Sequence, residues 1–582
     1  MKKLFKYLKP YWYIAIFSPL FMIAEVLVDL ALPTIMATIV NESIAAGSIS
    51  DAMQVIWQNG AKMIVLVILG GLTGLGAAGF ASAASQSFGN DLRRDAFAHV
   101  MALSPEQTDK FTVGSLVTRM TNDVTMMQTF VAQALRMFFR SPIMFVGGII
   151  MALRLNPKFG LVIAISLPIQ LAVVYLIMRK VRPMFDKVQE KLDNVNAVVQ
   201  ENVTGARVVK AYVREDHETR RFRSANESLY KKTIRVQNTL AFMSPFMMIV
   251  MNLSVIAIIW VGGLEVSGGV IEVGTVSAVI LYITQILMSV MMFSMMFQTI
   301  SRAQASAKRI NEVMDTVPVI RDGEYEGKGE EEPRGHVVFK NVEFRYPDAI
   351  GTPVLHDIDL DIKSGENVAV LGATGSGKTS LVALIPRYYD VTAGEILLDG
   401  VNLKEYKLDH LRGKIAYVLQ KSELFSGTVA ENLRWGNPEA TDEELREAAD
   451  IAQASEFIGK FSHGFDTMIA EKGASLSGGQ KQRLSIARAL LKKPDVLIFD
   501  DSMSALDLAT SARLQKALRE KLGNLTVITI AQRVASVMNA DRIIVLDGGT
   551  VAAEGSHEYL LENSPIYRDI YESQLKRGED LE

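Results

Sequence analysis

The first 300 residues contain six apolar stretches that are each long enough to cross a lipid bilayer, and no further stretch of this kind follows. A helix that crosses the hydrocarbon layer needs roughly 20 apolar residues. The sequence therefore predicts a membrane domain of six helices followed by a soluble domain. The six stretches run roughly through residues 12–36, 61–88, 129–153, 158–178, 238–264 and 274–300.

The overall composition averages these two unlike parts. Of the 582 residues, 49% are hydrophobic and 21% are charged. The mean hydropathy of +0.19 is too high for an ordinary soluble enzyme, and the charged fraction is too high for a chain that lies wholly in the membrane. The absence of cysteine excludes disulfide scaffolds, thiolate zinc sites and iron–sulfur sites. With 61 Lys and Arg against 64 Asp and Glu, no overall basic character points to nucleic acid as a partner.

Loop charge predicts which ends of the helices face the cytoplasm. The basic, aromatic segment 1–12 is followed by no small-residue cleavage site, which favours an interfacial lead-in over a signal peptide. Segments 41–60 and 261–274 carry no Lys or Arg, whereas both membrane-proximal ends of segment 179–237 do. By the positive-inside rule, the N-terminus, the long loops and the soluble domain are cytoplasmic in a multi-pass protein of the cell (inner or plasma) membrane. Arg154 and Lys158 form an exception, because their short turn would face outward.

The two long loops, residues 89–128 and 179–237, are rich in helix-compatible residues. We expect the membrane helices to continue into the cytosol and to be joined by turns near residues 112–115 and 204–206. A turn at the tip of such a hairpin can contact another domain.

Composition changes near residue 311, and the segment 322–335 (DGEYEGKGEEEPRG) is charged, contains glycine and lacks large aliphatic residues, as a linker does. The predicted domains are a membrane domain at residues 1–310, a linker at 311–336, an α/β domain at 337–572 and a tail at 573–582.

A phosphate-binding loop lies inside the α/β domain. Segment 367–372 (NVAVLG) is typical of a buried strand and segment 380–389 of a helix, and GATGSGKT at residues 372–379 joins them. Glycines let successive backbone N–H groups turn towards one anion, and the helix N-terminus adds its dipole. Lys378 would reach the β- and γ-phosphates, and the Thr379 hydroxyl would bind Mg²⁺. A Gly-rich turn that binds nothing is the alternative interpretation.

A second apolar strand, DVLIFD, ends at Asp500, which suits the metal-side acid of a phosphate-loop NTPase. A strand-terminal Asp is weak support by itself, because such residues are often helix caps. The segment LSGGQ at residues 476–480, followed by KQRLSIAR, adds weight to the assignment.

From these motifs the chain resembles the ATP-binding-cassette (ABC) family. LSGGQ, the strand after it and the segment SALD ending at Asp507 match the family's signature motif, Walker B motif and D-loop in order and spacing. Glu471 matches the acidic residue of the loop that contacts the membrane domain. Segments 118–123 (TRMTND) and 201–210 match two cytoplasmic loop signatures of the six-helix exporter type. The resemblance implies a six-helix all-α transmembrane exporter domain fused to an α/β P-loop NTPase cassette, with ATPase activity.

The resemblance also assigns site residues and the cofactors ATP and Mg²⁺. It gives Tyr346 the role of stacking on adenine, Gln420 that of the Q-loop glutamine, and Thr379, Gln420 and Asp500 the role of holding Mg²⁺. The ATP-binding set is Tyr346, Gly372, Thr374, Gly375, Ser376, Gly377, Lys378, Thr379, Ser380, Gln420 and Asp500. The signature residues Leu476, Ser477, Gly478, Gly479 and Gln480, with Asp507 of the D-loop, would act on ATP held by a second chain. The resemblance also implies a dimer of two such chains, which is consistent with a cassette being unable to fold its own LSGGQ onto its own phosphate loop.

Two catalytic positions depart from the family pattern. Asp501 stands where the family has the Glu that polarises water, and Gln532 stands where it has the switch histidine. Asp is shorter by one methylene, and Gln cannot share a proton as imidazole can. Together they favour a site that binds nucleotide but cleaves it slowly.

This pairing resembles the degenerate-site subunit of bacterial heterodimeric multidrug exporters, so the expected partner is a second half-transporter chain. The alternatives are a homodimeric lipid flippase or exporter of lipid-linked substrates, and an ATP-gated regulatory subunit without catalytic contribution.

Two groups in the membrane domain are candidates for a substrate cavity that would take hydrophobic or amphipathic drug-like substrates or membrane lipid. The first is the helical stripe of Met288, Met291, Met292, Met295 and Met296, because flexible thioethers repack around varied apolar ligands. Helix packing or lipid contact is the alternative. The second is Glu25 and Asp29, which share one helix face. They would recognise cations or, as we favour, pair structurally with Arg136 or Arg140.

Overall fold

The computed structural model describes residues 1–327, 334–347 and 349–579, and leaves out the side chains of residues 294, 295, 297, 298, 508 and 575–579. The chain divides into two compact units. The first comprises Met1–Met101 and Val113–Thr316, and the second comprises Ala102–Thr112 and Val317–Glu582.

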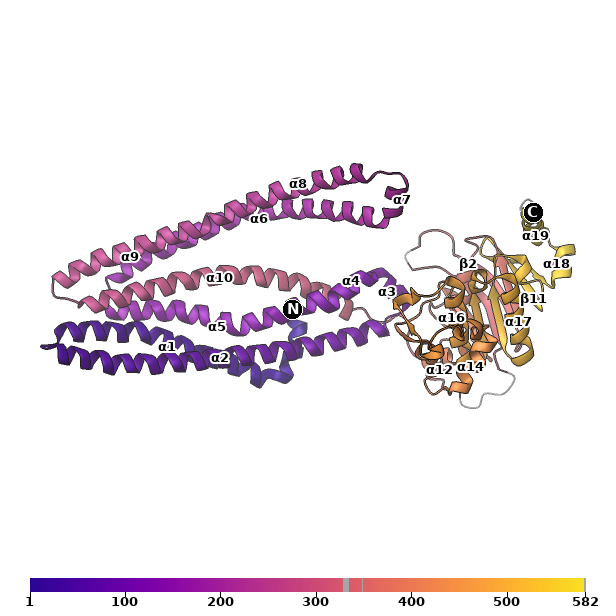
Figure 1. Cartoon of the computed structure of the whole chain (residues 1–582), viewed down its shortest axis with the longest axis horizontal. Helices are drawn as coiled ribbons and strands as arrows, with labels where there is room; N and C mark the ends of the chain where they lie inside the picture. Colours follow the sequence, from indigo (N-terminus) through magenta and orange to yellow (C-terminus); the bar gives the residue numbers. More distant parts are fainter. Residues whose placement is uncertain (328–333, 348, 580–582) are drawn as a thin grey trace. The chain divides into compact units, whose positions relative to one another are not determined.

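The first unit is entirely helical. Within the described residues, six helices are long and apolar enough to cross a membrane, and the six predicted spans are thereby confirmed. Their apolar parts lie in α1 (Trp12–Ala45), α2 (Ile49–Ala102), α5 (Val124–Leu155), α6 (Phe159–Thr204), α9 (Met243–Ser267) and α10 (Val273–Met314). The basic N-terminal segment forms a 3-10 helix, Lys2–Tyr11, which buries Leu4 and Tyr7. The helices α1, α2, α5 and α10 run side by side, and α6 pairs with α8 (Glu215–Ala241) (Figure 1).

The helices extend beyond the apolar stretches as predicted, and short elements join them at the far ends. In the first loop, α3 (Pro105–Phe111) and α4 (Val113–Thr118) meet at Thr112, whose positive φ of 57° makes the predicted turn. A π-helix, Arg119–Asp123, then leads into α5. The second hairpin turns at Gly205 as predicted, but its tip is longer, because α7 (Ala206–Ala211) precedes α8.

Polar contacts tie the turn between α5 and α6, which contains Lys158, to the bundle. Lys158 Nζ lies 2.5 Å from Glu265 Oε1, and Asn156 Nδ2 donates a 3.3 Å hydrogen bond to Glu265 Oε2. Lys158, one of the two cations that depart from the positive-inside pattern, therefore has an acidic partner at the end of α9.

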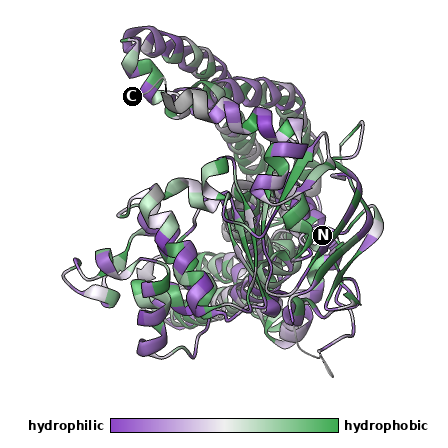
Figure 2. Cartoon of the chain, turned by 90° about the vertical axis from the view of Figure 1, so that its right-hand side faces the viewer, coloured by the Kyte–Doolittle hydropathy of each residue, from purple (hydrophilic) through white to green (hydrophobic). Residues whose placement is uncertain are grey.

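The second unit contains an α/β domain built on a six-stranded sheet of order β12-β11-β3-β10-β9-β6. All neighbours in it are parallel except β11 and β12. Every residue of β9 is buried, and in Figure 2 the strands at the centre of the domain are largely hydrophobic. The strands are β3 (Asn367–Gly372), β6 (Ile415–Val418), β9 (Val496–Asp500), β10 (Thr526–Ile530), β11 (Arg542–Asp547) and β12 (Thr550–Gly555).

An antiparallel sheet of order β2-β1-β4-β5 and the β7–β8 pair complete the strands. These are β1 (Val337–Phe344), β2 (Leu355–Ile362), β4 (Ala393–Leu398), β5 (Val401–Asn402), β7 (Gly427–Thr428) and β8 (Met468–Ile469). The helices are α11 (Lys378–Leu384), α12 (Leu408–Lys414), α13 (Val429–Arg434), α14 (Asp442–Ile451), α15 (Ser455–Ile458), α16 (Gly478–Leu491), α17 (Leu508–Lys521), α18 (His557–Asn563) and α19 (Pro565–Glu579).

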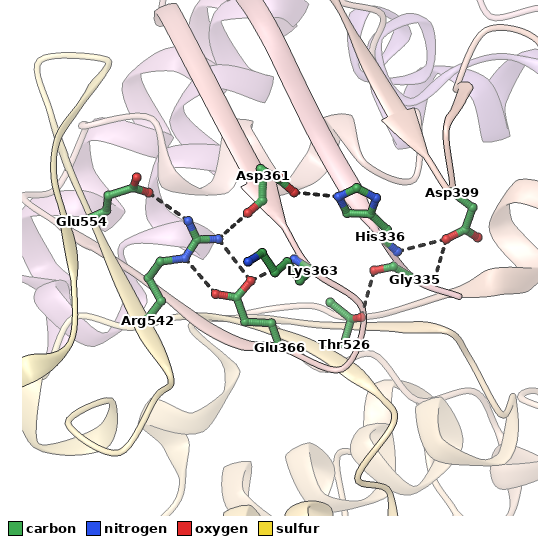
Figure 3. A network of polar contacts seen from close by, with 9 residues as sticks. All are labelled: Gly335, His336, Asp361, Lys363, Glu366, Asp399, Thr526, Arg542 and Glu554. Carbon is green, nitrogen blue, oxygen red and sulfur yellow. Dashed lines mark hydrogen bonds and ion pairs between the residues drawn. The ribbon is translucent and has the colours of Figure 1, made fainter. Parts of the chain in front are cut away.

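Hydrogen bonds anchor the end of the predicted linker to the α/β domain (Figure 3). The backbone N–H groups of Gly335 and His336 donate to Asp399 Oδ1 at 2.7 and 2.9 Å, and Thr526 Oγ1 donates to Gly335 O at 2.8 Å. Further upstream, the Tyr325 ring packs edge-on against Tyr406, with 4.9 Å between the centroids. Part of the 311–336 segment is thus attached to the cassette, while residues 328–333 lie outside the described residues.

Candidate functional site

The phosphate loop joins β3 to α11 in a conformation that only glycine accommodates at key positions. Gly375 and Gly377 have φ values of 87° and 97°. A Cβ on Gly372 would lie 2.2 Å from Leu546 O, and one on Gly377 would lie 2.7 Å from Leu355 Cδ2. The loop is therefore held close to its neighbouring strands with its backbone turned around one space, as anion binding requires.

Lys378 lies buried at the start of α11. Its Nζ donates to Gly372 O and Ala373 O, both at 2.8 Å. Burial lowers the pKa of this ammonium, and the negative charges of Asp501 and Asp500 oppose the shift. The hydroxyl of Ser376 is also buried, and it has no hydrogen-bond partner among the residues the structure describes. A desolvated cation and an unsatisfied hydroxyl fit a bound phosphate, which would supply the missing partners.

The predicted metal-side acid, Asp500, ends β9 next to the phosphate loop. Thr379 Oγ1 donates to its Oδ1 at 2.9 Å. Tyr417 OH donates to its Oδ2 at 2.8 Å, and burial, followed by the charge of Asp500, raises the pKa of this phenol. The sequence reasoning missed Tyr417. It comes from β6, whose pairing with β9 sets Tyr417 opposite Ile498.

Asp501 and Gln532, the two residues that depart from the family pattern, contact each other through one carboxylate oxygen of Asp501. Gln420 Nε2 and Gln532 Nε2 donate to Asp501 Oδ2, at 2.9 and 2.7 Å. Asp501 is buried and has a φ of 49°, a left-handed conformation that is uncommon outside glycine. The short acid is therefore held by two neutral amides.

A cavity of about 300 Å³ connects these groups. Of the predicted residues, it is lined by Thr374, Gly375, Gly377, Lys378, Thr379, Ser380, Gln420, Asp501 and Gln532. Val354 and Ile530 complete the lining, and neither carried a sequence signal. Tyr346 lies beside it, with its OH 2.9 Å from Ser380 Oγ and its ring edge-on to Phe344 and Tyr389.

The oxygens at this cavity suit a hard cation. Thr379 and Asp500 already contact each other, and the amide oxygen of Gln420 is left over once its nitrogen donates to Asp501. In the described part of the chain no group of three His, Cys, Asp or Glu residues could hold a metal. A magnesium ion needs few protein ligands when phosphate oxygens and water supply the others.

The signature segment is not part of this cavity. Ser477 caps the N-terminus of α16, accepts from Gln480 N at 3.4 Å, and is exposed together with Gly478. Asp507 caps α17 through Thr510, whose hydrogen bonds lower the pKa of the carboxyl. Leu476, Gly479 and Gln480 likewise do not line the cavity.

In the membrane unit, the acids of α1 have the structural partner that we favoured. Arg140 of α5 forms ion pairs with Glu25 and, at 3.0 Å, with Asp29. The methionines at the predicted stripe do not share one environment. Met288 and Met292 are 50% and 38% exposed, Met291 is half-buried and Met296 is buried, while the side chain of Met295 lies outside the described residues.

Comparisons with known proteins cover nearly the whole chain. Residues 15–290 match the family described as ABC transporter transmembrane region, and residues 355–504 match the family described as ABC transporter. The chain is 38% identical over 577 residues to the uncharacterized ABC transporter ATP-binding protein YfiB of Bacillus subtilis, covering 99% of both.

It is also 36% identical over 494 residues to an ATP-dependent lipid A-core flippase of Desulfotalea psychrophila, covering 84% of this chain and 85% of that protein. Among solved structures, a bacterial Atm1-family ABC exporter with ATP bound superposes with a TM-score of 0.81 at 25% identity. That match covers 97% of this chain and 98% of the other.

Proposed function

This chain belongs to the ABC transporter family as a transmembrane region fused to an ATP-binding cassette, and we propose that it is the degenerate-site half of a heterodimeric multidrug exporter. In this proposal it binds ATP between its own Walker motifs and the signature motif of a partner half-transporter. Its own LSGGQ completes the active site of that partner. The exporter lies in the cell membrane with the N-terminus and cassette in the cytoplasm, and moves hydrophobic or amphipathic compounds.

One observation carries the proposal: both amides that reach the catalytic acid converge on Asp501 Oδ2. Because Asp is one methylene shorter than Glu, its carboxylate lies about an ångström short of where a Glu carboxylate would lie, and the two amides hold it there. A displacement of that size can cost roughly a hundredfold in rate. Gln532 cannot exchange a proton. The phosphate loop keeps the residues that nucleotide binding at this site needs, so binding is retained while cleavage is slow.

The residues fit ATP with Mg²⁺. Lys378, the backbone N–H groups of the phosphate loop and Ser376 would hold the phosphates, and Tyr346 would support adenine. Thr379, Asp500 and Gln420 would hold Mg²⁺, which when bound neutralises phosphate charge. Asp501 and Gln532 would orient water only weakly.

The test uses this chain co-expressed with the product of its neighbouring gene and reconstituted in lipid. We expect Ser477→Ala to lower the ATPase rate of the complex about a hundredfold, as the loss of one charge-stabilising donor does. Asp501→Asn is expected to change it less than about threefold, because this site contributes little turnover. Fast hydrolysis by the lone chain, undiminished without any partner, would overturn the proposal.

A homodimeric lipid flippase is the second candidate, and the identity with a protein named lipid A-core flippase supports it. Purification as an equal pair of this chain, with lipid-stimulated ATPase activity, would favour it. A regulatory subunit without catalytic contribution would leave the ATPase rate of the complex unchanged in Ser477→Ala.

A further inference from the structure

A groove opens between α5, α6 and α10 of the membrane unit, and the acids of α1 do not line it. Its volume is about 1070 Å³, above the roughly 300–1,000 Å³ of most small-molecule sites. A groove of this size accommodates a ligand with a long body.

One end of the groove is apolar and lies within the predicted spans 129–153, 158–178 and 274–300. Its walls are hydrophobic and aromatic, and several of these side chains are exposed. This end is lined by Phe145, Leu171, Val174, Tyr175, Met178 and Val290. Such a surface suits acyl chains.

The other end is cationic and lies just beyond those apolar stretches. Arg182 of α6 and Arg302 of α10 line it, together with Ser301 and one acid, Asp186. Neither guanidinium makes a hydrogen bond or an ion pair with any residue that the structure describes. This contrasts with Arg140 in the same unit, whose charge two acids neutralise.

We propose that this groove binds an anionic acyl-chain phospholipid, with the phosphate between Arg182 and Arg302 and a chain along the apolar walls. Two cations against one acid leave net positive charge where a lipid headgroup would lie. Guanidinium groups bind phosphate through paired N–H donors, and basic pockets between membrane helices select anionic headgroups. The binding site itself is independent of the proposed function. The cationic end of the groove would lie at the cytoplasmic leaflet, and only this placement rests on the membrane orientation given under the proposed function.

The test counts bound lipids on the full-length chain in detergent by native mass spectrometry. The probes are phosphatidylglycerol and phosphatidylcholine with identical acyl chains, in equal amounts and without ATP. We expect the unaltered chain to retain phosphatidylglycerol preferentially. The double variant Arg182→Gln/Arg302→Gln should lower the ratio of phosphatidylglycerol to phosphatidylcholine about tenfold, because it removes two charge-assisted contacts.

The matched control is Arg179→Gln/Lys180→Gln, which removes two cations from the same helix outside the groove lining. It should keep the preference. A further variant, Val174→Trp, fills the apolar end and should reduce retention of both lipids while leaving all charges in place. Thermal unfolding in detergent reports whether the membrane unit of each variant is folded, because all the substituted residues lie in that unit.

An equal loss of preference in the control would overturn the proposal, because diffuse attraction to basic residues would then explain it. Unchanged retention of both lipids by Val174→Trp would also overturn the proposal, since the acyl chain of the lipid would then lie outside the groove. Neither result depends on ATPase activity, so failure of this site and failure of the heterodimer proposal are distinguishable.

Discussion

The double substitution Asp501→Glu/Gln532→His should accelerate ATP hydrolysis by the lone chain. In the structure, Asp501 Oδ2 already accepts two amide hydrogen bonds, at 2.9 and 2.7 Å. An added methylene moves the carboxylate outward by about an ångström. The histidine at the neighbouring position replaces an amide that holds the acid with a group that can share a proton.

The size of the gain follows from what the two changes restore. A catalytic group misplaced by about 1 Å can cost roughly a hundredfold in rate. We therefore expect the double variant to hydrolyse ATP about a hundredfold faster than the unaltered chain, which corresponds to about 2.7 kcal/mol of transition-state stabilisation.

The assay measures phosphate release by the purified chain in lipid at saturating ATP and Mg²⁺. Asp409→Glu is the control, because it makes the same chemical change at an exposed position outside the cavity. A double variant that is no faster than this control would refute the reasoning. So would an unaltered lone chain that already turns over at about 10 s⁻¹, the median for enzymes.

Three further substitutions test other contacts. Arg140→Gln leaves two acids of α1 without their cation and should destabilise the membrane unit by about 3 kcal/mol, measured by thermal unfolding in detergent. Asp123→Asn removes the buried carboxylate that holds α10 and should cost about 2 kcal/mol in the same assay. Glu312→Gln removes a more exposed carboxylate, which pairs with Arg119, and should cost less than about 1 kcal/mol. Tyr417→Phe frees Asp500 and should weaken ATP binding about tenfold with Mg²⁺ but not with EDTA, in fluorescent-nucleotide titrations.

Most of the residues that line the cavity were named from motifs, because these motifs lie at or just after strand ends. Asp500 ends β9 and Ile530 ends β10, which pair in register, and Gln532 follows two residues later. Parallel strands present their carboxyl ends at one sheet edge, so residues distant in sequence meet there. Tyr417 was not predictable in this way, since its role depends on β6 being the neighbour of β9, which only the sheet order reveals.

In the membrane unit, composition predicts which segments span but not what each helix face contacts. The methionines of α10 form one stripe by helical spacing, yet Met288 is half exposed and Met296 is buried. α10 packs against α1, α5 and α9, so one face meets several environments along its length. The groove beside Arg302 arises for the same reason, because α10 forms it together with α5 and α6, which lie far from α10 in sequence.

The two departures from the family pattern are best treated as one change, because they share an atom. Gln532 donates to the oxygen of Asp501 that Gln420 also contacts, so either substitution alone alters the partner of the other. Asp501→Glu alone would push its carboxylate against the Gln532 amide, and Gln532→His alone would remove a hydrogen bond from a buried acid. We therefore expect the two single variants together to lower the activation free energy of hydrolysis by less than the double variant does. The difference, measured as the coupling energy of a double-mutant cycle, should be about 1–3 kcal/mol. Strictly additive single effects would mean that the two positions act independently, and the shared-oxygen geometry would then have no part in slowing hydrolysis.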